Sequence, residues 1–200
     1  KIYLQFRHTH LTGGIVANES PPLCRYLHIL NDIAYYGDIT DSGQRFPNRI
    51  LQSIPGSPDS VSLTFFDDIE DALMGISSTR NNVVALGRIS IYRLNGAFNN
   101  LGQGAISHER ISDEIGCIST RSIVRTEIGI FFAGNDGFYF TDGFQLIKIS
   151  IDLDETYARL TRSEEQRSRI TGTYDRLTRR IWWTVQEEPT DTDCNACFIF

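Results

Sequence analysis

This 200-residue sequence has very little lysine, and it lacks catalytic motifs and long apolar runs. Its 19 basic residues include only two lysines, Lys1 and Lys148, so nearly all of the positive charge is carried by arginine. Arginine forms planar, bidentate pairs with carboxylates, which suits ion pairs within or between subunits. No run of about 18 apolar residues occurs, so we predict no membrane-spanning helix. The net charge of −6 argues against tight, counterion-driven binding of nucleic acid.

Motifs that would indicate an enzyme are missing as well. No serine stands in a G-x-S-x-G elbow, and no glycine-rich loop ends in the lysine that phosphate-binding loops use. The spacing of the carboxylates singles out no acid–base pair of the kind that cleaves glycosides. We therefore expect a protein that is not an enzyme, with no catalytic residues and no bound cofactor.

Cysteine is scarce, with only Cys24, Cys117, Cys194 and Cys197 in the chain. Cys194 and Cys197 form a C-x-x-C motif, but no second C-x-x-C accompanies it. A zinc site would need two more ligands, from the other two cysteines or from a histidine. We favour reduced thiols in a protein that is not secreted, and we predict no metal site.

Two other groups have metal-binding chemistry. His8 and His10 lie two residues apart on one face of an expected strand, but no third ligand is in view. The acidic run from Asp67 to Asp71 could bind Ca²⁺ or Mg²⁺ through carboxylate oxygens. It lacks the central glycine and the alternating ligand order of an EF-hand loop. We interpret it as a solvated connector that could include one helical turn.

Aromatic residues and turn signals are what the sequence does contain. Hydrophobic residues make up 40% of the chain, with 12 Phe and 8 Tyr, which favours a packed β protein over disorder. The stretch from Gly116 to Ser150 holds three apolar runs separated by Gly134–Gly137 and by Asp142-Gly143. Such Gly and Asp turns between apolar runs are typical of β-hairpins, so calcium binding is not needed to explain them. We predict a meander here, with Ser122–Thr126 as a fourth strand.

The rest of the chain repeats this pattern of short strands and turns. Other expected strands are 1–10, 25–30, 33–36, 48–53, 76–79, 83–86, 89–94, 169–174, 180–185 and 196–200. Polar segments are expected as loops at 37–44, 99–114 and 186–195, and Asn95-Gly96 is expected to close a group of strands. The charged stretch Asp154–Arg169 has the makings of a short helix, with Tyr157 and Leu160 on one face.

Four continuously apolar strands recur at a regular interval, each after a polar turn. They are Ile33–Tyr36, Val83–Leu86, Ile130–Ala133 and Ile181–Thr184, whose first residues are 50, 47 and 51 positions apart. Continuous apolar runs are typical of strands that are buried on both faces. A period of 40–50 residues built from short strands indicates a β-propeller with four-stranded antiparallel blades. A β-sandwich or jelly roll is the alternative fold.

The expected blades divide the chain at polar boundaries. They are 1–56, 57–100, 116–150 and 169–200, with 151–168 as a connector that could be helical. A closed propeller needs about four to eight blades. The sequence begins without Met and both its ends lie within expected strands. We therefore expect it to be a piece of a longer chain.

Several segments together resemble the propeller region of a family of short-tailed bacteriophage tail proteins. The segments are Pro47–Ile50 with Pro55–Pro58, then 81–96 (NNVVALGRISIYRLNG), 116–124 (GCISTRSIV), 130–143 (IFFAGNDGFYFTDG) and 180–184. The family comprises the nozzle, or tail tubular protein B, and the packaged-DNA-stabilisation proteins. The resemblance covers roughly Tyr26–Val185. It is poor at Phe65–Asp71, and Gln186–Asn195 is longer than a plain hairpin.

The resemblance implies a structural protein of the virion, made in the host cytoplasm. Family members form a hexameric ring below the adaptor, near the portal, and adjoin the tail fibres. They retain the packaged DNA and let it leave during infection without sequence-specific binding. We expect 99–114 to contact a neighbouring protomer or the adaptor.

A carbohydrate-binding or carbohydrate-cleaving propeller that recognises a receptor is the alternative function. Trp182-Trp183 beside Arg179-Arg180 could form a platform for a sugar ring with cationic neighbours. In a central strand, however, the two tryptophans are expected to fill the core between sheets.

Overall fold

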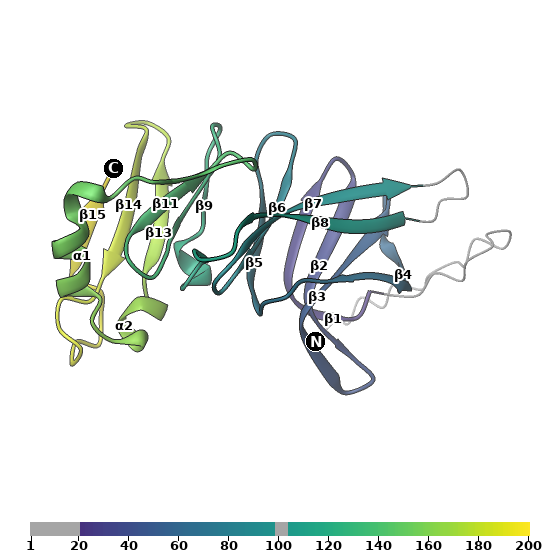
Figure 1. Ribbon diagram of the computed structural model, residues 1–200, viewed down its shortest axis with the longest axis horizontal. Coiled ribbons are helices and arrows are strands. Elements are labelled where there is room, and N and C mark those ends of the chain that lie inside the picture. Colours follow the sequence, from purple (N-terminus) through teal and green to yellow (C-terminus); the bar gives the residue numbers. More distant parts are fainter. Residues whose placement is uncertain (1–20, 99–103) are drawn as a thin grey trace, which may run out of the picture. The chain divides into compact units, whose positions relative to one another are not determined.

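The computed structural model describes residues 21–98 and 104–200, and these residues are mostly β-structure (Figure 1). Strands account for 53% and helices for 11%, which confirms the all-β class in outline. The strands form several antiparallel sheets of three or four strands, in which each strand pairs with its sequence neighbours. The described residues do not form a closed propeller.

The chain divides into two compact units, each described here by itself. The first comprises Lys1–Glu70 and Asn95–Ser107, and the second comprises Asp71–Leu94 and His108–Phe200. The first sheet lies in the first unit. Its strands are β1 (Leu23–Leu30), β2 (Ile33–Asp41), β3 (Gln44–Ile54) and β4 (Ser57–Asp68).

The other three sheets follow in chain order. The second sheet contains β5 (Leu73–Ser78), β6 (Val83–Gly87), β7 (Ile91–Phe98) and β8 (Gly104–Ser112). The third sheet contains β9 (Val124–Arg125), β10 (Ile130–Ala133), β11 (Phe138–Thr141) and β12 (Leu146–Lys148). The fourth sheet contains β13 (Thr171–Asp175), β14 (Arg180–Val185) and β15 (Ala196–Ile199).

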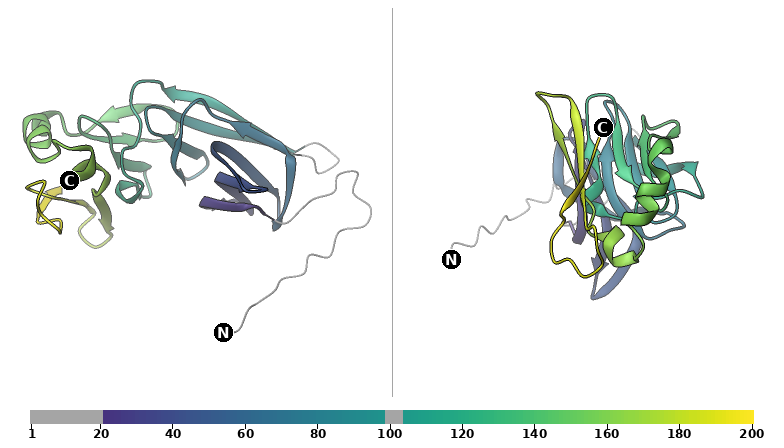
Figure 2. Two further views of the ribbon diagram at one scale, coloured as in Figure 1. Left: turned by 90° about the horizontal axis from the view of Figure 1, so that it is seen from below. Right: turned by 90° about the vertical axis from the view of Figure 1, so that its left-hand side faces the viewer.

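Two short helices join the third and fourth sheets. They are α1 (Asp154–Leu160), which follows a 3₁₀ turn at Ile151–Leu153, and α2 (Glu164–Ser168). The helical character expected over Asp154–Arg169 is confirmed, with Tyr157 and Leu160 buried in α1, but the stretch forms two helices and not one. Ser163 is the N-cap of α2 and forms a capping box with Gln166, so a new helix starts at this point. Figure 2 shows both helices beside the strands of the fourth sheet.

The first sheet begins with a hairpin that sequence analysis predicts correctly. Asn31 and Asp32 both have positive φ values, 51° and 59°, as a two-residue turn between twisted strands requires. The loop expected at 37–44 is wrong, because β2 and β3 continue through it to a second tight turn at Ser42-Gly43. A register shift next to Asp38 accommodates that polar residue within β2.

The blade boundary expected between residues 56 and 57 falls inside the first sheet. Pro55-Gly56 forms the turn between β3 and β4, so the sheet continues to Asp68. No helical turn forms in 67–71, because Asp67 and Asp68 pair with β3. The strand expected at 1–10 lies outside the described residues.

The second sheet is longer than expected. Asn95-Gly96 lies within β7 and does not end the group, and most of the loop expected at 99–114 is strand β8. Polar residues such as His108 and Glu109 gave this strand the composition of a loop. The four-stranded meander expected in the third sheet is confirmed, with β9 as the fourth strand. This strand is shorter than the expected 122–126, because Ser122 belongs to a 3₁₀ turn at Thr120–Ser122.

Within the second unit, the third sheet packs on the second sheet through one face and on the fourth sheet through the other. Ile130 and Phe132 of β10 belong to a buried cluster with Val84 and Leu86 of β6. Ala133 belongs to another cluster with residues of β14 and α1. Burial on both faces explains why β10 is continuously apolar.

The second and third sheets repeat the same local geometry 47 residues apart. Thr79 and Thr126 each begin a turn by donating a backbone N–H to the carbonyl oxygen three residues on, at 2.9 Å in both cases. Gly87 and Gly134 do the same at 2.8 Å. The periodicity seen in the sequence is therefore a structural repeat between these two sheets.

Candidate functional site

Residues 116–124, called the junction below, join the second, third and fourth sheets. Gly116 begins it without a Cβ, because an added Cβ would collide with the backbone of Gly87 and Arg88. The Cys117 N–H donates to the Gly87 carbonyl oxygen at 2.8 Å. The Ile118 N–H donates to the Ala133 carbonyl oxygen at 3.0 Å. The junction thus binds the ends of β6 and β10 through the main chain.

Ser122 extends these contacts to the fourth sheet. Its hydroxyl donates to the Ser119 carbonyl oxygen at 2.7 Å and accepts the Ala133 N–H at 3.0 Å. Its carbonyl oxygen accepts the indole N–H of Trp183 at 2.9 Å. Ser119 donates its hydroxyl to the carbonyl oxygen of Ile170 at 2.7 Å. These buried polar groups are paired across three sheets, which fixes their relative positions.

Cys117 fills the interior of the junction and is fully buried. Burial raises the pKa of its thiol to about 12, which outweighs the opposing hydrogen bonds from Ser119 and Ser122. A thiol in this state is neither a nucleophile nor a metal ligand at neutral pH. Cys117 therefore acts in packing.

The two tryptophans of β14 have different surroundings. Trp183 is completely buried and stacks on Phe138, with the ring centroids 4.1 Å apart, and Phe200 meets it edge-on. This confirms the expectation that it fills the core between sheets. Trp182 points to the opposite face of the strand and is half-buried. The pair does not form a shared aromatic platform for a sugar.

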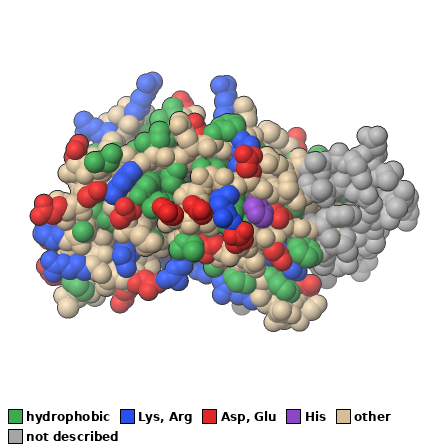
Figure 3. All heavy atoms as spheres, viewed as in Figure 1, with side chains coloured by type: hydrophobic (Ala, Val, Ile, Leu, Met, Phe, Trp, Pro, Cys, Tyr) green, Lys and Arg blue, Asp and Glu red, His purple; other side chains and the backbone are tan. Residues whose placement is uncertain are grey.

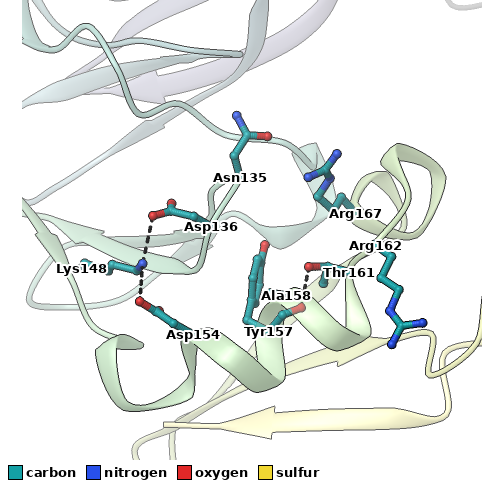
Figure 4. A pocket seen from close by; sticks show the side chains of 9 residues that line it. All are labelled: Asn135, Asp136, Lys148, Asp154, Tyr157, Ala158, Thr161, Arg162 and Arg167. Carbon is teal, nitrogen blue, oxygen red and sulfur yellow. Dashed lines mark hydrogen bonds and ion pairs between the residues drawn. The ribbon is translucent and has the colours of Figure 1, made fainter.

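A polar surface pocket of about 380 Å³ lies where the β10–β11 turn, β12 and the two helices meet (Figure 4). Its walls combine carboxylates, cations and amide or hydroxyl groups. The lining residues are Asn135, Asp136, Lys148, Asp154, Tyr157, Ala158, Thr161, Arg162 and Arg167.

Lys148 is the central charge of this pocket. Its Nζ lies 2.9 Å from Asp136 Oδ2 and 2.8 Å from Asp154 Oδ2. Partial burial opposes its charge, but these two carboxylates together raise the pKa of Lys148. Partial burial likewise opposes ionisation of Asp136, yet hydrogen bonds from Tyr139 and Lys148 lower its pKa. The lysine is therefore held as a cation and is not available as a base.

The remaining walls offer little for chemistry. Tyr157 donates its hydroxyl to the Gly134 carbonyl oxygen at 2.6 Å, and burial raises the pKa of this phenol. Thr161 donates to the Tyr157 carbonyl oxygen at 2.6 Å. Arg162 and Arg167 are the other two cations that line the pocket. Among the residues that line the pocket, no nucleophile is hydrogen-bonded to a base.

The candidates that the sequence suggested do not come together. Among the described residues no group of three or more His, Cys, Asp or Glu could hold a metal ion. All four cysteines are free thiols. His8 and His10 lie outside the described residues. Cys194 and Cys197 lie at the end of a loop and in β15, where each sulfur approaches only a backbone carbonyl oxygen.

The acidic run is more than a solvated connector. Asp68 holds Arg49 through two hydrogen bonds of 2.8 Å in the first unit. Asp71, in the second unit, accepts the N–H groups of Ala72 and Ile89 at 2.7 and 2.5 Å. Each carboxylate thus stabilises a local turn or strand pair and is not poised for a metal ion.

Sequence reasoning missed the pocket, because its residues come from four separate segments. Lys148 could have been found as the only lysine outside the first residue. The segments at Asp136 and Asp142 are hairpin turns, as predicted. Asp142 accepts the N–H groups of Phe144 and Gln145 at 2.9 and 3.0 Å.

Neither helix in the described part of the chain has the length or apolar character needed to cross a bilayer. No protein-family model matches the sequence, and a search of curated proteins finds no significant relative.

Proposed function

We propose that the chain is a structural protein of a bacteriophage tail, of the nozzle or packaged-DNA-stabilisation type. In this role it forms a homo-oligomeric ring, with six copies expected, around the path of the genome. The ring joins the portal and adaptor above to the fibres around it, and it retains DNA until ejection. The protein then acts in the virion, has no catalytic residues and needs no cofactor.

One observation carries this proposal. The family-like segments 81–96, 116–124, 130–143 and 180–184 are scattered along about a hundred residues, yet they meet at the junction. Gly87, Ala133 and Trp183, one from each of the other segments, all hydrogen-bond to residues 116–124. The family-like segments Pro47–Ile50 and Pro55–Pro58 lie in the first unit, so this support comes from the other four segments. The shared residues are therefore explained as the elements that hold successive sheets together.

The same proposal extends to how the sheets are arranged. We interpret the four sheets as successive blades of a β-propeller. The 47-residue structural repeat between the second and third sheets supports this interpretation. The residues that pack between sheets would then recur at each blade interface.

Charge supports a conduit more than a binding protein. A channel for DNA must let phosphates pass, and an overall net charge of −6 argues against tight, counterion-driven binding of the DNA along the whole protein surface. Several arginines are also engaged in ion pairs, such as Arg49 with Asp68 and Arg88 with Glu164. These pairs are partly exposed, so each adds little to stability.

The carbohydrate-binding alternative has less support. Its expected platform needed two exposed tryptophans, and Trp183 is completely buried. The polar pocket around Lys148 has no aromatic face against which a sugar ring could stack, since Tyr157 is also buried.

Assembly with partner proteins tests the proposal. The full-length protein is mixed with the portal and adaptor of its own phage, and complexes are sized by mass photometry. We expect a complex that contains several copies of this chain and one adaptor ring. A protein that stays monomeric with these partners, but binds strongly in a glycan screen, would overturn the proposal in favour of the carbohydrate function.

A further inference from the structure

Three hairpin turns of the second unit lie along one edge, at the top of Figure 1 and of the right-hand view in Figure 2. They are the β5–β6 turn at Thr79–Asn82, the β9–β10 turn at Thr126–Gly129 and the β13–β14 turn at Asp175–Arg180. We call them together the hairpin edge. A Cβ on Gly143, in the β11–β12 turn, would lie 3.2 Å from Asn82 Cβ, so the second and third sheets end together here.

Arginines are concentrated on this edge of an otherwise acidic protein. Figure 3 shows Lys and Arg side chains projecting along it. The residues concerned are all exposed: Arg80, Arg125, Arg176, Arg179 and Arg180. Within the described residues, the first four make no ion pair or side-chain hydrogen bond. Their charges are therefore available to a partner.

Three carboxylates lie among these arginines, and two of them serve the turns. Asp175 accepts the Leu177 N–H at 2.9 Å and the Thr178 hydroxyl at 2.6 Å, and these bonds lower its pKa. Asp142 is bonded to the backbone of its own turn. Glu127 is the third. Five arginines against three carboxylates leave the edge positive, while the whole chain has a net charge of −6.

The turns are rigid supports for these charges. Thr79 and Thr126 each accept the N–H of the residue three positions on with their hydroxyl, at 3.2 and 3.3 Å. Asp175 performs the same task in the third turn. Binding of a partner to the edge therefore costs little conformational entropy of these turns.

We propose that the hairpin edge is a contact surface for the phosphate backbone of duplex DNA. This inference rests on the proposed function and names the part of the conduit that touches the genome. Packed sheets lie about 10 Å apart, so successive turns present guanidinium groups in a row at about that interval. Duplex DNA carries a charge for about every 1.7 Å of its axis, so such a row meets phosphates wherever it lies along the backbone. Arginine pairs with phosphate oxygens in a bidentate manner.

A protein partner fits the edge less well. Protein interfaces bury an apolar centre, whereas the exposed apolar side chains here, Ile128, Phe144 and Leu177, stand on three different turns. The contact is sequence-independent and weak in one subunit, because only a few phosphates are neutralised. Several copies in a ring would strengthen it by raising the effective concentration.

Two matched triple variants test the inference by fluorescence anisotropy with a labelled 30-base-pair duplex, from low to moderate salt. The edge variant is R80Q/R176Q/R179Q. The control variant, R88Q/R121Q/R159Q, removes the same charge from exposed arginines elsewhere in the second unit. Thermal melts confirm that both fold.

We expect the edge variant to bind at least about tenfold more weakly at low salt. For this variant, the slope of log K against log salt concentration should be smaller in magnitude by about 2–3. Each lost phosphate contact removes about 0.9 from the slope, and three arginines are replaced. The control variant should retain most of the binding. Equal losses in both variants, no binding by the unmodified protein, or stronger competition by poly-glutamate than by unlabelled DNA would overturn the inference. If the protein forms rings with the adaptor but does not bind DNA, the inference of a DNA-contact surface is wrong, whereas the proposed function stands.

Discussion

The indole N–H of Trp183 donates a 2.9 Å hydrogen bond to the carbonyl oxygen of Ser122, 61 positions earlier in the chain. This bond joins the fourth sheet to the junction that already holds the second and third sheets. Both residues are completely buried. The order of the sheets in the second unit thus depends on a small number of polar contacts inside an apolar interface.

Replacing Trp183 by Phe should destabilise the protein more than its size change suggests. The variant keeps the aromatic stack on Phe138 but leaves the Ser122 carbonyl oxygen buried without a donor. We expect the free energy of unfolding to fall by about 1–3 kcal/mol for the lost partner, in addition to the loss from packing. Urea denaturation measures it, with Trp182→Phe as the control on the less buried face. Equal losses in the two variants would contradict the role assigned to the hydrogen bond.

Gly116→Ala should be destabilising although it adds a single methyl group. The new Cβ would press on the backbone of Gly87 and Arg88, which cannot move without breaking the Cys117–Gly87 hydrogen bond. We expect a loss of about 1–3 kcal/mol, towards the upper end of the range for overpacking. Thr192→Ala, in the exposed β14–β15 loop, is the control. An unchanged melting temperature of Gly116→Ala would contradict this prediction, because the junction would then accommodate the added methyl group without strain.

The ion pair between Asp136 and Lys148 should stabilise the protein in a pH-dependent way. The folded-state pKa of Asp136 is lowered by its hydrogen bonds, so the stabilisation is present above the unfolded value of about 3.9. It is lost as the pH falls through the lower folded-state pKa. The difference in melting temperature between the unmodified protein and Asp136→Asn should therefore shrink below about pH 4. Glu155→Gln serves as the control, and a difference that stays constant from pH 7 to pH 3 would argue against the assignment.

Cys117 should be the least reactive of the four thiols. Its pKa is raised to about 12 by complete burial, whereas Cys197 is exposed. Iodoacetamide at pH 8 should modify Cys197 well before Cys117 in the native protein, and mass spectrometry of peptides reads out the order. In denaturant, all four should react at similar rates. Native labelling of Cys117 as fast as Cys197 would mean that the junction opens readily.

The sequence predicted those elements whose causes are local. Asn31-Asp32 and Gly134–Gly137 make turns through their own backbone preferences, and β6 and β10 are apolar throughout because both of their faces are covered. The regular spacing of the central strands was visible for the same reason.

Elements whose causes lie elsewhere in the chain were missed. Strand β8 and the end of β2 are polar, so composition suggested loops, whereas pairing with neighbouring strands determines their structure. Asp38 sits inside β2 because Arg45 binds its carboxylate at 2.5–2.6 Å, a contact that no spacing rule signals. The pocket around Lys148 was missed because Asp136 and Asp154 meet only after the turn and α1 have formed.

Negative-stain electron microscopy of the full-length protein, alone and with its phage's adaptor and portal, tests the central claim most directly. The proposed function predicts rings with an open centre of about 20 Å or more, enough for a duplex whose major groove alone is about 12 Å wide. Particles that remain single subunits, or rings whose centre is closed to DNA in every class of image, would contradict it.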